Sequence, residues 1–251
     1  MSDGIYLAAN VFVDRLNEQG QSMGQIIGPI NTTKLSIKAE AESKPRISNK
    51  KASKGQALDD IKIAKPAAIG WEFDDQPAEL VAMALMGEVQ TINEASGTLT
   101  DKPVTLPANN SWVAVGHNNF ASEGLVVSQA ATELVMGTDY EFNYALGLIR
   151  ALPGGAVNGG GSITVTGQYN AVSGKRIRGG TKSQTRLRLF GEGENLTNGK
   201  RMKFDIYDAS MMPSSEMDLS GSDYVSGALE GTAKLPPGKN EPYVVDELTD
   251  S

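Results

Sequence analysis

The side chains that could carry out catalysis are few in this sequence. The one histidine, His117, lies in a polar run, where a lone histidine is more often a surface residue than a general base. Glu40 and Glu42 form a carboxylate pair, and Asp74 and Asp75 form another. Residues i and i+2 of a strand lie about 6.5 to 7 Å apart on one face, a separation that suits glycoside hydrolysis. Because aromatic residues make up only 6% of the chain, we expect these carboxylates to act electrostatically and not on a sugar.

The sequence also lacks the motifs of common enzyme classes. There is no cysteine, no His-Glu-x-x-His and no Gly-x-Ser-x-Gly, so thiolate metal sites, zinc hydrolysis and serine chemistry have no starting residues. The glycine-rich run 154–161 is not followed by Gly-Lys-Ser/Thr or by a helix pattern, which favours a turn over a phosphate-binding loop. We predict a protein that is not an enzyme and that binds no cofactor and no metal.

Composition favours one folded domain with an acidic surface. The 251 residues are 39% hydrophobic and 21% charged, enough for a core, and they predict a single domain over residues 1–235 followed by a polar tail, 236–251. The formal charge of −7 excludes a protein that grips nucleic acid by neutralising phosphates. No signal peptide and no membrane span is predicted, so we expect a soluble protein made in a cytoplasm.

Two strands and the basic segment between them dominate the pattern. In Lys34–Glu42, apolar and polar residues alternate, which predicts a strand with one wet face. The return segment Ile61–Asp74 alternates as well, although Pro66 must interrupt the pairing or mark a bulge. The connection 43–60 is basic and too long for an ordinary hairpin turn. It is either a solvated mobile loop or an arm that docks on another subunit.

The remaining segments predict a two-sheet β-sandwich or barrel with one flanking α-helix. A helix is expected over 77–87, capped by Asp74, Asp75 or Gln76 and covering an edge or corner of the sheet. Short strands punctuated by Gly, Pro and Asn follow. Segment 17–28 is predicted to be a turn-rich connection. Trp71 and Trp112 both lie in patterns typical of core strands.

Several of these segments, in this order, resemble the tail tube protein, or major tail protein, of long-tailed bacteriophages. The resemblance rests on the hairpin 42–59 with its return strand and helix, on Gly-Thr-Asp-Tyr at 137–140 with Gly-Leu-Ile at 147–149, and on the glycine turn 191–199. The run 88–123 and the glycine tract 154–161 depart from the family pattern.

The resemblance implies a structural virion protein of the phage tail, assembled in the host cytoplasm. Subunits would join as hexameric rings whose sheets merge into a ring-wide β-barrel, and rings would stack into a hollow tube through which genome DNA passes without specific binding. Other partners implied are tail proteins such as the tape measure, the terminator and a sheath, with no membrane. A barrel closed between subunits removes strand edges and needs a polar channel face. The lumen candidates are Ser36, Lys38, Glu40, Glu42, Thr164, Thr166 and Gln168.

For the hairpin arm, the resemblance implies contacts between successive rings. The candidate residues are Lys44, Arg46, Lys50, Lys51 and Lys54. They would meet an acidic surface of the next ring, with the tail segment 241–250 among the candidates.

Two other readings of the sequence stay open. The chain could be a related tail ring that does not polymerise, or the inner tube of an injection system. It could instead be a monomeric β-sandwich that binds a ligand, which would need an exposed aromatic patch.

Overall fold

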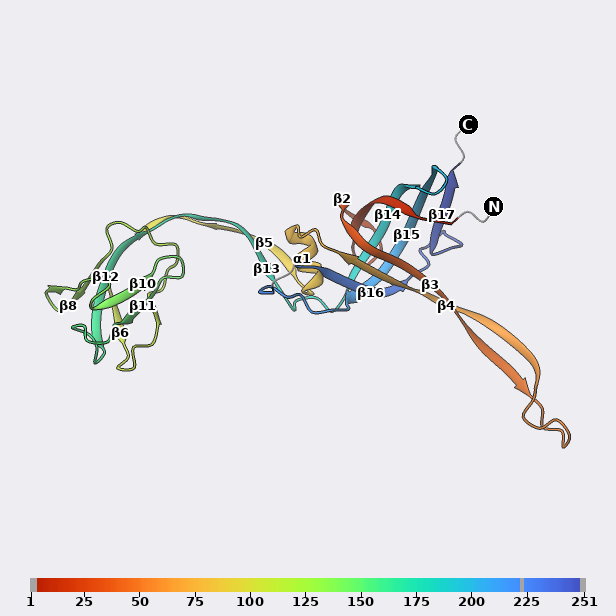
Figure 1. The fold of residues 1–251 in the computed structure, drawn as a ribbon, viewed down its shortest axis with the longest axis horizontal. Helices are drawn as coiled ribbons and strands as arrows, with labels where there is room; N and C mark the ends of the chain where they lie inside the picture. Colours follow the sequence, from red (N-terminus) through yellow and green to blue (C-terminus); the bar gives the residue numbers. More distant parts are fainter. Residues whose placement is uncertain (1–3, 222–223, 249–251) are drawn as a thin grey trace. The chain divides into compact units, whose positions relative to one another are not determined.

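Figure 1 shows the fold in a computed structural model that describes residues 4–221 and 224–248. The chain forms two compact units: unit 1 contains the chain through residue 90 and again from residue 177, and unit 2 contains residues 91–176. The sequence predicted one domain over residues 1–235, whereas in the structure a second unit is inserted into the first. The predicted class is confirmed at the level of a mainly β protein with several sheets and a single helix in the described residues.

Unit 1 is built on an eight-stranded antiparallel sheet. Its strands follow the order β2–β1–β14–β15–β16–β4–β3, and β17 pairs with β15 beside this path. Their bounds are β1 Leu7–Leu16, β2 Ser22–Ile30, β3 Thr32–Ile47, β4 Ala57–Phe73, β14 Thr185–Asn195, β15 Lys200–Pro213, β16 Gly227–Ala233 and β17 Tyr243–Leu248. The long β15 pairs with two strands along the same edge: its first half pairs with β17 and its second half with β16.

The two edges of this sheet meet at one residue. The edge strands β2 and β3 are consecutive in sequence, and only Asn31 separates them. The sheet must therefore curl until its edges come together at this corner. In the described part of the chain it does not close into a barrel, so β2 and β3 keep open edges.

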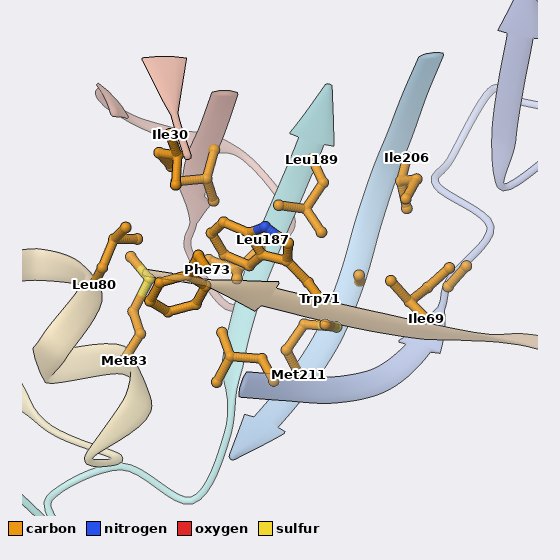
Figure 2. Packing of buried hydrophobic residues seen from close by; sticks show 14 of the residues in the cluster. Ile30, Ile69, Trp71, Phe73, Leu80, Met83, Leu187, Leu189, Ile206 and Met211 are labelled. Carbon is orange, nitrogen blue, oxygen red and sulfur yellow. The ribbon is translucent and has the colours of Figure 1, made fainter. Parts of the chain in front are cut away.

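The core of unit 1 lies on the concave side of this curl. In β4, the residues alternate between buried and partly exposed from Ala67 to Phe73, as the hydrophobic pattern of the sequence predicted. Trp71 and Phe73 are fully buried, and their rings lie 4.5 Å apart. Figure 2 shows them packed against Leu187 and Leu189 of β14. Burying a side chain of this kind stabilises the fold by about 1.5 to 3 kcal/mol.

The one described helix, α1 (Ala78–Ala84), adds Leu80 and Met83 to this core (Figure 2). It is shorter than the predicted 77–87, and the predicted side-chain cap is wrong. Pro77 is the N-cap residue and no side chain caps the helix, because Asp74 and Asp75 bond to Asn31 instead. In the described residues no helix is long and apolar enough to cross a membrane.

Two strands lie where the sequence predicted irregular structure. Segment 17–28 was expected to be a connection, yet β2 begins at Ser22; an edge strand tolerates the glycines and Pro29 that obscured it. The segment 236–251 was expected to be a polar tail outside the domain, yet β17 pairs with β15 from Tyr243 to Leu248. The last residues of that tail, 249–251, lie outside the described residues.

Unit 2 consists of two small sheets that share one core. The first has the order β6–β12–β8–β9 and the second β10–β11–β7. Their bounds are β6 Gly97–Leu106, β7 Val113–Ala114, β8 Val126–Gln129, β9 Thr132–Glu133, β10 Tyr140–Asn143, β11 Leu148–Ala151 and β12 Gly161–Tyr169. Ile163 and Val165 of the first sheet belong to the same buried cluster as Phe142 and Ile149 of the second, which is the arrangement of a β-sandwich.

The chain leaves unit 1 through β5 (Glu88–Glu94) and returns through β13 (Val172–Arg178), and these two strands pair with each other. An ion pair joins them, because Arg176 Nη2 lies 3.3 Å from Glu94 Oε1. The inserted unit therefore begins and ends at one two-stranded ladder.

Candidate functional site

The hairpin of β3 and β4 continues far beyond the core of unit 1. The two strands pair from Thr32 with Phe73 out to Ile47 with Ala57, so half of the connection predicted over 43–60 is strand. We call residues 38–66 the arm. On the strands of the arm, every residue is exposed on both faces of the ladder. Figure 1 shows the arm extending away from the other strands of unit 1.

The arm begins at a bulge that the sequence predicted. Lys38 lies opposite Ala68 and Glu40 opposite Lys65, so β4 has one residue more than β3 in this interval, which contains Pro66. A proline cannot donate to the ladder and is accommodated at such a bulge. The interruption predicted at Pro66 is confirmed.

A compact turn closes the far end of the arm. Ser48 is fully buried within it and its hydroxyl lies 2.8 Å from that of Ser53. The Ser48 amide donates to the Gln56 carbonyl at 2.8 Å and the Gly55 amide donates to the Ser48 carbonyl at 3.0 Å. The tip is therefore a hydrogen-bonded turn.

The five basic candidates lie on the outer part of this arm, and all are exposed. No ion pair joins Lys44, Arg46, Lys50, Lys51 or Lys54 to any described residue. The neighbouring acids nearer the body are paired, as for Asp60, whose Oδ2 lies 2.6 Å from Lys62 Nζ. Residues 44–59 thus carry these five positive charges against Asp59 alone, on a chain whose formal charge is −7.

The arm also exposes large apolar side chains. Ile61 is 62% exposed and Ile63 is 44% exposed, while Ile47 and Leu58 near the tip are exposed to a similar degree. Exposed apolar side chains beside free positive charge make the arm a candidate interaction surface.

The lumen candidates of β3 lie at the root of the arm. Ser36 is half-buried, whereas Lys38, Glu40 and Glu42 are exposed. Lys38 Nζ lies 2.7 Å from Glu40 Oε1, and this hydrogen bond holds the pKa of the Glu40 carboxyl below its ordinary value. Glu42 lies 3.8 Å from Lys65. Paired charges of this kind give the strand a nearly neutral polar face.

The lumen candidates of β12 belong to unit 2 and therefore to a different sheet from β3. Gln168 is exposed, but Thr164 and Thr166 are half-buried. Thr166 Oγ1 accepts a hydrogen bond from the Asp101 amide at 3.0 Å. The structure does not bring the two predicted sets together on one sheet.

A second surface, which the sequence analysis did not single out, lies on the outer face of the unit 1 sheet. Phe12 of β1 is the direct register partner of Phe190 of β14, and their rings stack 5.7 Å apart. A cavity of about 340 Å³ lies over them, bordered by Val244, Glu192 and Asp246. The alternation of β14 could have indicated this surface, because Leu187 and Leu189 point to the core and Phe190 must therefore point outward.

Two residues of unit 2 with potential chemistry, His117 and Asp139, have structural partners. His117 stacks on Tyr169 at 4.1 Å between ring centroids, on the surface of unit 2. Asp139 of the Gly-Thr-Asp-Tyr segment accepts the amides of Val135 and Ala156 at 2.8 Å each. In residues 4–221 and 224–248, no three metal-binding side chains come together.

The prediction that both tryptophans lie in the core is half right. Trp71 is fully buried, whereas Trp112 is 39% exposed at the start of β7, with the Arg150 guanidinium 4.8 Å from its ring centroid. A short strand of two residues gives too little alternation to show which way its neighbour points.

Comparison with known proteins gives a family without an assigned activity. No curated protein matches this chain. A family model described as "Protein of unknown function UCP028589" matches residues 5–243, almost the whole chain, so the chain belongs to that family.

Proposed function

We propose that this protein is a structural subunit that assembles with copies of itself into rings, and that these rings stack into a hollow tube of the kind formed by tail tube proteins of long-tailed bacteriophages. In this proposal the tube passes genome DNA and belongs to a virion tail. The arm is the observation that carries the proposal.

The arm supports self-assembly because it is unstable as an isolated element. A two-stranded hairpin without a packed face is at best marginally stable in water. This one keeps twenty residues, 38–47 and 57–66, exposed in strand conformation and presents Ile61 and Ile63 to solvent. Such a ribbon becomes a stable element when another molecule covers one of its faces.

The open sheet of unit 1 supports lateral association. The strands β2 and β3 form its two edges, and each leaves a row of backbone groups without sheet partners. In a ring, the edge strand of one subunit would pair with the edge of the next, and the curled sheets together would enclose a channel. That pairing would satisfy the edges without any change of fold.

The charge pattern supports a channel that does not retain DNA. Lys38 is neutralised by Glu40, and Lys65 lies beside Glu42, on a chain with a formal charge of −7. The affinity of a surface for DNA rises with the number of lysines and arginines that are free to contact phosphates. Five cations without an ion pair to any described residue lie on the outer arm, where the proposal places contacts between rings.

Electron microscopy of the purified protein tests the proposal. Tubes are the expected result; single rings would indicate a tail ring or terminator-like part, and monomers would overturn the proposal. A shortened variant tests the role of the arm tip. In it, Asn-Gly replaces residues 49–55 between Ser48 and Gln56, whose backbones already pair. This variant should keep the fold, measured by circular dichroism, and lose long tubes.

One observation favours a second candidate, a monomeric ligand-binding sandwich. Unit 2 has its own core, and Trp112 exposes an aromatic face beside Arg150 on its surface. A monomer in the microscope, together with fluorescence changes of Trp112 on addition of sugars, would favour this candidate over the tube.

A further inference from the structure

The exposed isoleucines of the arm share one face with its unpaired cations. Ile61 lies opposite Lys44 in the register, and Arg46 follows two residues along on the same face. Ile63, opposite Glu42, extends the apolar row toward the body. Directly opposed residues have Cβ atoms about 4.5 to 5.5 Å apart, so Ile61 and Ile63 lie beside Lys44 and Glu42 on this face, and Arg46 lies beside Asp59 without an ion pair to any described residue.

The Phe12–Phe190 surface has the complementary pattern. We call it the phenylalanine groove: Phe12 and Phe190 with Val244 of β17, bordered by Glu192 and Asp246. Glu192 follows Phe190 by two residues on β14, which places its carboxylate about 6.5 to 7 Å further along the same face. An apolar centre therefore has acids at its rim.

The negative charges at the border of the groove are only partly neutralised by cations of the same subunit. Asp205, which also borders it, is paired with Arg188 through two hydrogen bonds, of 2.9 and 2.6 Å. Lys203 borders the groove and lies opposite both Glu192 and Asp246 in the register, and the Arg188 guanidinium lies 4.7 Å from the Phe190 ring centroid. The exposed Glu192 makes only a long hydrogen bond, 3.4 Å from Asn10 Nδ2, and both it and Asp246 are available to an incoming cation.

We propose that the arm of one copy docks in the phenylalanine groove of a second copy, with Ile61 and Ile63 over the phenylalanine pair and with Lys44 and Arg46 facing Glu192 and Asp246. This inference rests on the proposed self-assembly and names the surface that receives the arm. Docking covers one face of the ribbon and supplies acids to cations that lack them.

The groove of the same molecule does not receive the arm in this structure. Ile63 is six residues from the buried Ile69 along β4, about 20 Å at the rise of a strand, and Figure 1 shows the arm directed away from the sheet. Ile61 and Ile63 remain 62% and 44% exposed in the isolated chain. A second copy is the occupant that offers the matching charge.

Disulfide cross-linking tests this contact directly, because the chain has no cysteine of its own. Ile63→Cys and Val244→Cys are purified separately, mixed and oxidised, and the cross-linked peptides are identified by mass spectrometry. The expected product is a mixed dimer of the two variants. Its yield should exceed that of either variant alone at least tenfold.

Matched controls come from the next residue on each strand. Val245 is 54% exposed and Lys62 is exposed, but alternation turns each to the opposite face from its neighbour. Val245→Cys with Ile63→Cys, and Val244→Cys with Lys62→Cys, should therefore give little product. Equal yields from the controls would overturn the proposal.

Charge reversal adds an independent readout. Lys44→Glu with Arg46→Glu in the Ile63→Cys chain should lower the cross-link at least tenfold, and Glu192→Lys with Asp246→Lys in the Val244→Cys chain should restore it. An unchanged yield overturns the assigned charge pairing. If tubes form without the cross-link, this docking is refuted and the proposed function stands. If the cross-link forms without tubes, the docking is supported and the proposed tube is refuted.

Discussion

Asn31 donates a hydrogen bond from its Nδ2 to Asp74 Oδ1 at 2.6 Å. The Asn31 backbone amide donates to Asp75 Oδ2, also at 2.6 Å, and its carbonyl accepts from the Asp74 amide at 3.3 Å. These bonds join the corner where β2 passes into β3 to the segment that leads into α1. The single residue that links the two edges of the sheet is thus fixed by three bonds.

We predict that Asn31→Ala lowers the free energy of unfolding of unit 1 by about 1 kcal/mol, because it removes the side-chain bond and leaves the two backbone bonds in place. Asp75→Ala removes the carboxylate that holds the Asn31 amide and should cost a similar amount. Urea unfolding followed by Trp71 fluorescence measures both. Asn240→Ala, at an exposed position, is the control and should change stability by less than about 0.5 kcal/mol.

A larger effect is expected at the ion pair between Arg186 and Asp208. Arg186 Nε lies 3.1 Å from Asp208 Oδ1, and the Asp208 side chain is only 4% exposed. Asp208→Ala leaves the guanidinium largely buried without its partner, so we predict a loss of about 3 to 5 kcal/mol.

The matched control is an exposed pair in the same sheet. Lys34 Nζ lies 2.8 Å from Glu72 Oε1, with both side chains more than 40% exposed. Glu72→Ala should cost no more than about 1 kcal/mol in the same urea titration. Equal losses at the two sites would contradict the role assigned to burial.

Alternation in the sequence predicted the burial of a strand correctly where the chain itself covers one face, and not at residues 38–42 and 61–66, which alternate but are exposed. Alternation in β4 correctly indicated that Ile69, Trp71 and Phe73 point inward, because period-two burial leaves its mark directly in the residue types. It did not show that β3 and β4 continue as a ladder to Ile47 and Ala57, because residues 43–47 and 57–60 contain few large apolar side chains and do not alternate.

The division into two units was not predictable for a related reason. The alternation of Ile163 and Val165 in β12 shows that one face is buried, but not against which strands. Those residues pack on Phe142 and Ile149 within unit 2 and not on β3. Period-two patterns specify a face, whereas the partner sheet is set by contacts distant in sequence.

Stability in acid should depend on Asp139. Hydrogen bonds from the Ala156 and Val135 amides hold the pKa of the Asp139 carboxyl below its ordinary value of 3.8. A lowered pKa means that the stabilisation is complete above pH 3.8 and is lost as the pH falls through the lower pKa of the folded state. Asp139→Asn lacks the charge and turns an amide donor toward one of the two N–H groups.

We therefore predict that Asp139→Asn speeds hydrogen exchange at Ala156 and Val135 by the same factor throughout pH 5 to 7, after correction for intrinsic exchange. Below about pH 4 the wild-type protein should approach the variant. Glu133→Gln, at an exposed position nearby, is the control and should leave both amides unchanged. A difference that grows toward low pH would have the wrong sign for a lowered pKa.

Unit 2 should be removable without unfolding unit 1. Every residue of the core around Trp71 comes from unit 1, and every residue of the core around Phe142 comes from unit 2. The insertion begins and ends at the paired strands β5 and β13, so an Asn-Gly turn can replace residues 95–171 between Glu94 and Val172. We predict that this shortened chain keeps the blue-shifted fluorescence of a buried Trp71 and unfolds cooperatively in urea.

The reciprocal fragment, residues 91–176, should fold on its own with dispersed amide resonances. If the chain without residues 95–171 forms the same assemblies as the full chain, then the surfaces that join subunits lie in unit 1, where the arm and the phenylalanine groove are found. If assembly is lost while unit 1 is still folded, an essential contact lies in unit 2.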